Sequence, residues 1–95
     1  KMICNCYNTG NISGVFQVGG IVGYSVNYNT TDNITIENCY NTGEVTTSSS
    51  YSADAGGIAG ENYDGTIENC YFLDIISKGV GNDTGNTDGS FIVPS

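Results

Sequence analysis

The feature that most constrains the fold of this chain is an internal repeat. The segment 3–12, Ile-Cys-Asn-Cys-Tyr-Asn-Thr-Gly-Asn-Ile, recurs at 36–45 as Ile-Glu-Asn-Cys-Tyr-Asn-Thr-Gly-Glu-Val. A third copy starts at Ile67 with Ile-Glu-Asn-Cys-Tyr and diverges from Phe72 onward. The equivalent cysteines of successive copies are 33 and 31 residues apart, so the repeat is about 32 residues long. A fixed period of this length is typical of repeat architectures.

A second, glycine-rich motif alternates with the first. It reads Val-Gly-Gly-Ile-Val-Gly at 18–23 and Ala-Gly-Gly-Ile-Ala-Gly at 55–60. The spacing between the two motifs varies, and the extra residues fall in the polar stretches 25–33 and 46–54. Because loops tolerate changes of length and strands do not, both stretches are predicted to be surface loops. The glycine pairs indicate close backbone packing or a tight turn.

The patterned segments favour an all-β fold. They are four to seven residues long, rich in Ile, Val, Tyr and Cys, and interrupted by Gly, Asn and Thr. Such segments are too short and too often broken by glycine for helices. Short strands at a fixed period predict a parallel β-solenoid with about three coils of about 32 residues. We expect the repeats to occupy residues 1–76 and a C-terminal cap or tail to occupy 77–95.

Stacked coils would place equivalent residues one above another, about 4.8 Å apart. Ile36 and Cys39 are three residues apart, so both can face inward only if the strand bends at Asn38. Asn suits such a bend because its side-chain amide can form hydrogen bonds with the local backbone. The predicted structural ladders are Ile3/Ile36/Ile67, Asn5/Asn38/Asn69, Cys6/Cys39/Cys70 and Tyr7/Tyr40/Tyr71, with Ile12/Val45/Ile76 and Ile21/Ile58 as further apolar stacks.

The four cysteines admit three interpretations: a buried stack of thiols, a disulfide or a metal site. Structural zinc sites pair their ligands as Cys-x2–4-Cys, whereas only Cys4 and Cys6 are close in this sequence. Cys fills small apolar positions well, so a stack of free thiols, one in each coil, is the favoured interpretation. Cys4 aligns with Glu37 and Glu68 and is therefore expected to face outward. No metal or other cofactor is predicted.

The charge of the chain excludes several partners. Two Lys+Arg face ten Asp+Glu, which gives a net charge of −8, and His and Trp are absent. A chain so acidic cannot neutralise phosphates, so nucleic acid is excluded as a partner. No apolar run approaches the length of a membrane span, and membrane insertion is not expected. Without His, the commonest general base is missing, and the chain is not expected to be an enzyme.

Two acidic patterns remain open to a functional interpretation. Glu37 and Glu68 would share one outward ladder, and glycoside hydrolysis requires only two carboxyl groups at a defined separation. The alternative for them is a solvated face that keeps the chain soluble. The segment 81–89 is dense in Asn, Asp and Gly, but it lacks the register of a calcium-binding loop, so a turn is the simpler interpretation.

Tyrosines in or beside the variable stretches are the candidate binding residues. Tyr among Ser, Asn and Gly is the composition of many recognition surfaces. The alternative is that these rings pack over the edges of the coils. The four candidates are Tyr24, Tyr28, Tyr51 and Tyr63.

The alternating motifs resemble the GLUG-motif repeats of bacterial surface and secreted proteins. The resemblance is carried by 20–23, 57–60 and the Ile-x-Asn-Cys-Tyr-Asn-Thr-Gly segments, and it covers residues 3–76. It implies a non-catalytic, adhesin-like stalk of an extracellular or cell-surface protein that binds a host protein or a glycan. The alternative is a carbohydrate-binding or carbohydrate-cleaving β-solenoid module. Because the chain enters patterned sequence at once, we expect it to be part of a longer polypeptide.

Overall fold

The regular structure of the chain consists of β-strands. The computed structural model describes residues 1–26, 34–48, 55–73, 78–83, 85–88 and 91–93, and every helix or strand element among them is a strand. Within these residues, no helix is long and apolar enough to cross a membrane. The all-β class predicted from the short, glycine-broken segments is therefore confirmed.

Equivalent strands recur in each copy of the repeat. The first copy contains β1 (Met2–Cys4), β2 (Tyr7–Asn8), β3 (Ile12–Gly14), β4 (Val18–Gly19) and β5 (Val22–Val26). The second contains β6 (Thr35–Glu37), β7 (Tyr40–Asn41), β8 (Val45–Thr47), β9 (Ala55–Gly56) and β10 (Ala59–Tyr63). The remaining strands are β11 (Thr66–Glu68), β12 (Tyr71–Leu73), β13 (Val80–Asp83), β14 (Asn86–Asp88) and β15 (Phe91–Val93).

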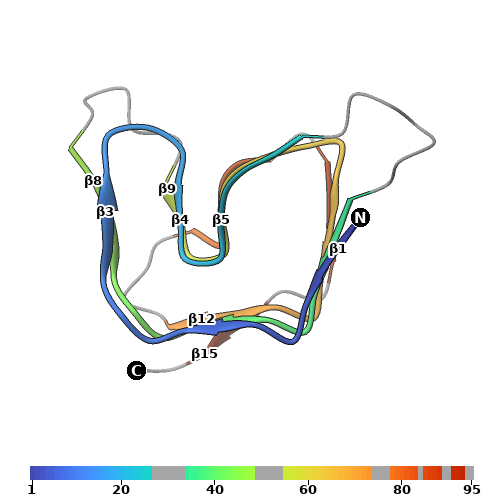
Figure 1. Ribbon diagram of the computed structural model, residues 1–95, viewed down its shortest axis with the longest axis horizontal. Coiled ribbons are helices and arrows are strands. Elements are labelled where there is room, and N and C mark those ends of the chain that lie inside the picture. The colour runs from blue at the N-terminus through green and yellow to red at the C-terminus, as the bar shows by residue number, and fades with distance from the viewer. Residues whose placement is uncertain (27–33, 49–54, 74–77, 84, 89–90, 94–95) are drawn as a thin grey trace.

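The copies are joined by parallel pairing of equivalent strands. The sheet orders are β1-β6-β11-β14, β15-β12-β7-β2, β13-β10-β5, β3-β8 and β4-β9. The pairing is in register with the repeat, because Ile3 lies beside Ile36 and Ile36 beside Ile67. Figure 1 shows the consequence: the chain follows nearly the same path in each copy, so equivalent strands overlie one another. Each copy therefore gains its backbone partners from its neighbours in the stack.

A sharp bend follows the first strand of each copy. Asn5, Asn38 and Asn69 adopt the left-handed backbone conformation, with φ of 57°, 57° and 54°. Asn tolerates this conformation better than most other side chains. The bend allows Ile36 and Cys39, three residues apart, to be buried together, as the sequence predicts.

The glycine-rich motif folds the chain back into the interior of each copy. In Figure 1, β4 descends between the outer walls formed by β3 and β1, and β5 returns beside it. A Cβ at Gly19 would collide with the carbonyl oxygen of Val22, and one at Gly56 would collide with the carbonyl oxygen of Ala59. Glycine is required at both positions because the two segments approach backbone to backbone. The interpretation of the glycine pairs as sites of close backbone packing is confirmed.

The apolar core runs along the stack. It consists of buried side chains from the second and third copies, with partly buried side chains of the first and second copies and of β13 packed against it. Ile36, Ile58 and Ile67 are fully buried, whereas Ile3 in the first copy is only half-buried. The same motif is therefore most deeply buried where it has a copy on both sides. The buried members of the core are Ile36, Cys39, Ile58, Ala59, Ile67, Cys70 and Phe72.

In 77–95, for which the sequence predicts a cap or tail, three strands of the described residues extend existing sheets. β13 pairs with β10, β14 with β11 and β15 with β12, all in parallel. Among the described residues, the sheets of β3 and β4 are not extended beyond β8 and β9. Ile76, the expected third member of the Ile12/Val45 stack, lies outside the described residues, and Ile12 and Val45 are paired.

The two predicted loops coincide only in part with described residues. Ser25 and Val26 belong to β5, and Thr46 and Thr47 belong to β8. The rest of each loop, apart from Ser48, falls in 27–33 and 49–54, outside the described residues. The start of each predicted loop was therefore placed too early, because polar residues such as Ser and Thr also occur in strands.

Candidate functional site

The most distinctive surface feature of the described chain is a column of exposed tyrosines, which we call the tyrosine column. Tyr7, Tyr40 and Tyr71 begin β2, β7 and β12 and are paired in register. Each follows the cysteine that comes after the bend, and because successive side chains on a strand alternate, an inward cysteine places the tyrosine outward. Their exposed fractions are 65%, 43% and 39%.

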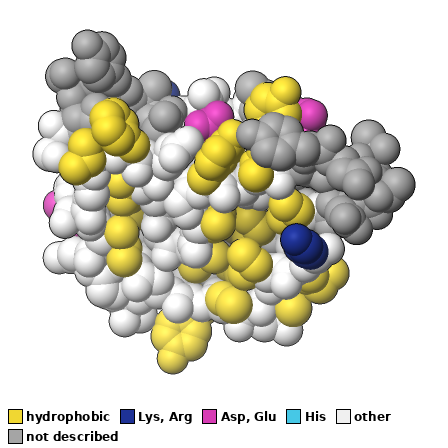
Figure 2. Space-filling view, turned by 45° about the horizontal axis from the view of Figure 1, so that its top comes forward, with side chains coloured by type: hydrophobic (Ala, Val, Ile, Leu, Met, Phe, Trp, Pro, Cys, Tyr) yellow, Lys and Arg dark blue, Asp and Glu magenta, His cyan; other side chains and the backbone are white. Residues whose placement is uncertain are grey.

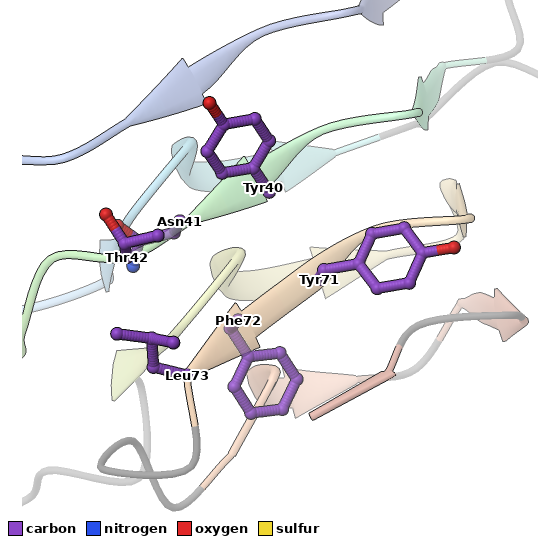
Figure 3. A pocket seen from close by; sticks show the side chains of 6 residues that line it. All are labelled: Tyr40, Asn41, Thr42, Tyr71, Phe72 and Leu73. Atoms are coloured by element: carbon purple, nitrogen blue, oxygen red, sulfur yellow. The ribbon is translucent and has the colours of Figure 1, made fainter. Parts of the chain in front are cut away.

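Two rings of the column are in contact. The ring centroids of Tyr7 and Tyr40 are 5.2 Å apart and the ring planes differ by 8°, so the rings stack. The third ring is oriented differently: in Figure 3, Tyr40 leans toward the neighbouring strand β2, whereas Tyr71 extends along β12 away from Leu73. The column therefore opens between Tyr40 and Tyr71.

A hollow occupies this opening. It has a volume of about 290 Å³ and lies on the outer face of β7 and β12. The Tyr40 and Tyr71 side chains are on one side of it, and Thr42 and Leu73, each two residues further along the chain, are on the other. We call this feature the tyrosine hollow. The residues that line it are Tyr40, Asn41, Thr42, Tyr71, Phe72 and Leu73.

The inner side of the same strands is held by a buried asparagine. The Asn41 side-chain nitrogen donates hydrogen bonds to the carbonyl oxygens of Gly57 (2.9 Å) and Gly43 (3.1 Å). Its oxygen accepts from the side-chain nitrogen of Asn8 (2.8 Å) and from the backbone nitrogen of Gly43 (2.9 Å). These bonds connect β7 to the inward fold of the glycine-rich motif and to the first copy. They fix the strand that carries Tyr40.

Phe72 takes the same position in the third copy. It is 5% exposed and lies against two glycines of the inward fold, where a Cβ at Gly57 or at Gly79 would come within 2.7 Å of Phe72 atoms. The inner support of β12 is therefore apolar packing, where that of β7 is a hydrogen-bond network. Both arrangements hold the tyrosine of their strand on the outer surface.

The cysteines of the predicted ladder directly precede the tyrosines of the column, and one expectation about them is wrong. Cys39 and Cys70 are buried as predicted, but Cys6 is exposed, because no described strand covers the outer edge of the first copy. Burial raises the pKa of the Cys39 thiol and raises that of Cys70 to about 11. Both buried thiols are therefore protonated at neutral pH and unsuited to act as thiolate ligands or nucleophiles. Cys4 is exposed, and none of the four cysteines forms a disulfide in the structure.

Only two of the four tyrosines predicted as binding residues can be placed. Tyr24 lies in β5 and Tyr63 in β10, and each is 40% exposed. They are not register neighbours, because Tyr24 pairs with Glu61 and Tyr63 with Val26. Tyr28 and Tyr51 lie outside the described residues. The sequence predicts the tyrosine column as a structural ladder but not as a binding surface. The signal for its exposure is the alternation of side chains along a strand, which turns each Tyr outward when the preceding Cys faces inward.

The acidic residues form a column of their own. Glu37 and Glu68 are register neighbours and both are half-buried, and the backbone of Asp88 in β14 pairs with that of Glu68. Asp83 of the Asn/Asp/Gly segment accepts a local hydrogen bond from the Gly85 backbone nitrogen (3.1 Å) and one from the side chain of Asn62 on the paired strand β10 (3.2 Å). Within the described part of the chain, no group of three or more Cys, Asp or Glu side chains is placed to hold a metal ion.

The surface offers few positive charges. Figure 2 shows hydrophobic side chains at several places on one face of the molecule and little Lys or Arg. The sequence contains only two basic residues, Lys1 and Lys78. None of the six described residues that line the tyrosine hollow is charged. An anionic ligand would therefore find no counter-charge in the hollow and an unfavourable field around the molecule.

In-register stacking of equivalent strands defines this chain as a repeat protein of the all-β class. A family model described as the GLUG motif matches residues 14–46 and 51–77, more than half of the chain. The chain therefore belongs to the GLUG motif family, in agreement with the resemblance found in the sequence. Comparison with curated proteins and with solved structures found no match.

Proposed function

We propose that this chain is a β-solenoid segment with a structural and interaction role, without catalytic activity, in an extracellular protein of the bacterial surface. The observation that carries the proposal is the in-register parallel stacking of the GLUG repeats, in which each copy pairs with its neighbours. Repeats that contact only adjacent repeats build long, thin structures suited to a stalk.

The sheet edges support extension of this stack into a longer protein. Strands β1 to β5 each lie at one end of their sheets, with hydrogen-bonding groups directed along the stack. Met2 is 60% exposed and Ile3 half-buried at this end, although Ile36 is fully buried in the second copy. Additional coils would pair with these edges and bury these side chains. This favours a stalk-like arrangement in which further repeats continue the column.

The competing proposal is a carbohydrate-cleaving module that uses Glu37 and Glu68. These two glutamates lie in one column on the same face, about one strand spacing apart. Carboxylates that cleave glycosides instead flank the bond, with the substrate between them. Turnover of a polysaccharide that is lost in a Glu68→Gln variant with an intact fold would favour cleavage over a structural role.

Surface labelling tests the proposed location. Antibodies raised against the folded chain should label intact cells of the bacterium that produces it, and brief protease treatment of those cells should remove the label. A cytoplasmic protein of the same cells serves as the control and should remain unlabelled until the cells are lysed. Labelling that appears only after lysis would refute the surface role.

A further inference from the structure

We infer that the tyrosine hollow binds one uncharged pyranose ring of a glycan, with an apolar face of the sugar against Tyr40 and Tyr71. The inference rests on the interaction role proposed above and names the class of ligand and the residues that contact it. The tyrosine column is not among the residues that the sequence identified as binding candidates.

The shape of the hollow favours a compact ring-shaped ligand. The hollow is open to solvent, and the extended backbones of β7 and β12 lie beneath it, with the two tyrosines on one side and Thr42 and Leu73 on the other (Figure 3). Its volume of about 290 Å³ suits a single small ring rather than a polypeptide segment. A binding site of this type combines an apolar lining with a few polar groups that fix orientation.

The chemistry of the lining selects a sugar among small rings. A pyranose has an apolar face of C–H groups and a rim of hydroxyls, and tyrosine offers a matching apolar ring with a polar end. Thr42 is exposed at the edge of the hollow, and its hydroxyl can both donate and accept a hydrogen bond to the sugar. Leu73 provides apolar contact on the β12 side, and Phe72 holds this strand from the inner side. The ligand thus meets apolar surface with its face and hydroxyl groups at its edge.

Charge selects an uncharged sugar. The chain carries a net charge of −8, and no Lys is among the described residues that line the hollow, so acidic sugars and nucleotides are disfavoured. A cationic ligand would find no carboxylate among the lining residues. Neutral hexoses remain as the class that matches the lining.

The packing of the tyrosine rings determines where along the tyrosine column a ligand can bind. Tyr7 and Tyr40 stack at 5.2 Å and fill the space between them, so no ligand can enter there. Between Tyr40 and Tyr71 the rings diverge, and the hollow exposes Tyr40 on the side that Tyr7 does not cover. The third copy differs from the second at the two residues after Tyr71, where Phe72 and Leu73 replace Asn and Thr. The divergence of the repeat therefore coincides with the hollow.

The test is a glycan array probed with the whole chain, followed by titration calorimetry with each glycan that binds. We expect neutral glycans to bind and their sialylated or sulfated forms to bind less. Tyr71→Leu, which keeps an apolar side chain but removes the ring, should weaken binding about tenfold. Tyr71→Phe keeps the ring and should remain within about threefold of the parent. Circular dichroism and thermal unfolding check that both variants fold.

Tyr24→Leu is the matched control, because Tyr24 is as exposed as Tyr71 but lies in β5, away from the hollow. Its affinity should equal that of the parent chain. Equal loss of binding in Tyr24→Leu and Tyr71→Leu would overturn the assignment of the hollow, as would binding restricted to anionic glycans. Silence across the array would overturn the sugar ligand while leaving the surface-labelling result, and with it the structural role, intact.

Discussion

The first and second copies of the repeat carry almost the same sequence but occupy different environments. Ile36 and Cys39 are buried, whereas their equivalents Ile3 and Cys6 are half-buried and exposed. The strands pair in register, so the local backbone is the same in both copies. The comparison shows that the motif specifies which side chains point inward, while burial is supplied by the copy stacked on each side.

Substitution of the stacked isoleucines by alanine is expected to give the largest difference in stability between the copies. Ile36 is fully buried between Ile3 and Ile67, so Ile36→Ala removes buried methyl groups and leaves a cavity. The expected loss in the free energy of unfolding is about 3–4 kcal/mol. Ile3→Ala should lose about half as much, because its side chain already contacts solvent. Urea denaturation of both variants measures the two values.

Equal losses for Ile36→Ala and Ile3→Ala would break the comparison. That outcome would mean that the outer face of the first copy is covered in solution, for example by another molecule of the same chain. Sedimentation of the parent chain at several concentrations would reveal such an association.

The stacked asparagines Asn8 and Asn41 should show a smaller difference in their contribution to stability. Asn41 is buried and takes part in four hydrogen bonds, and Asn41→Ala would leave the Gly57 carbonyl oxygen without the bond that Asn41 donates. We expect a loss of about 2 kcal/mol, against about 1 kcal/mol for Asn8→Ala in the half-buried equivalent position. The free energies of unfolding of the two variants measure this difference. A loss in Asn8→Ala as large as that in Asn41→Ala would show that burial does not determine how much each asparagine contributes to stability.

Much of the fold followed from the sequence, and the parts that did not have identifiable physical causes. The period and the Ile-x-Asn-Cys pattern were sufficient to predict all-β structure and the bend, because a side-chain alternation of two cannot otherwise bury residues three apart. The exposure of Cys6 was not predicted, since burial depends on what lies beyond the first copy. The hollow was not predicted either, because it depends on the direction of the Tyr71 ring, which the strand pattern alone does not determine.

The smallest difference between the copies is expected in the pH dependence of stability. It distinguishes the buried thiol of Cys70 from the exposed thiol of Cys6. The pKa of Cys70 rises from 9.0 to about 11 because burial disfavours the thiolate. Between these two values the unfolded chain releases the proton while the folded chain retains it. Stability is therefore constant below the lower value, falls as the pH rises through this interval and levels off above the upper one. The loss expected from about pH 8 to about pH 10 is about 1 kcal/mol.

Paired cysteine variants isolate this contribution, because they leave every other titratable group of the chain unchanged. The free energy of unfolding of Cys70→Ala should decline less than that of the parent over the same interval, by the amount that the thiol contributes. Cys6→Ala should follow the parent, because the Cys6 thiol is exposed in the folded chain. A parent and a Cys70→Ala profile of the same slope would show that Cys70 reaches solvent. The contrast between buried and exposed copies of the motif would then not extend to the cysteine column.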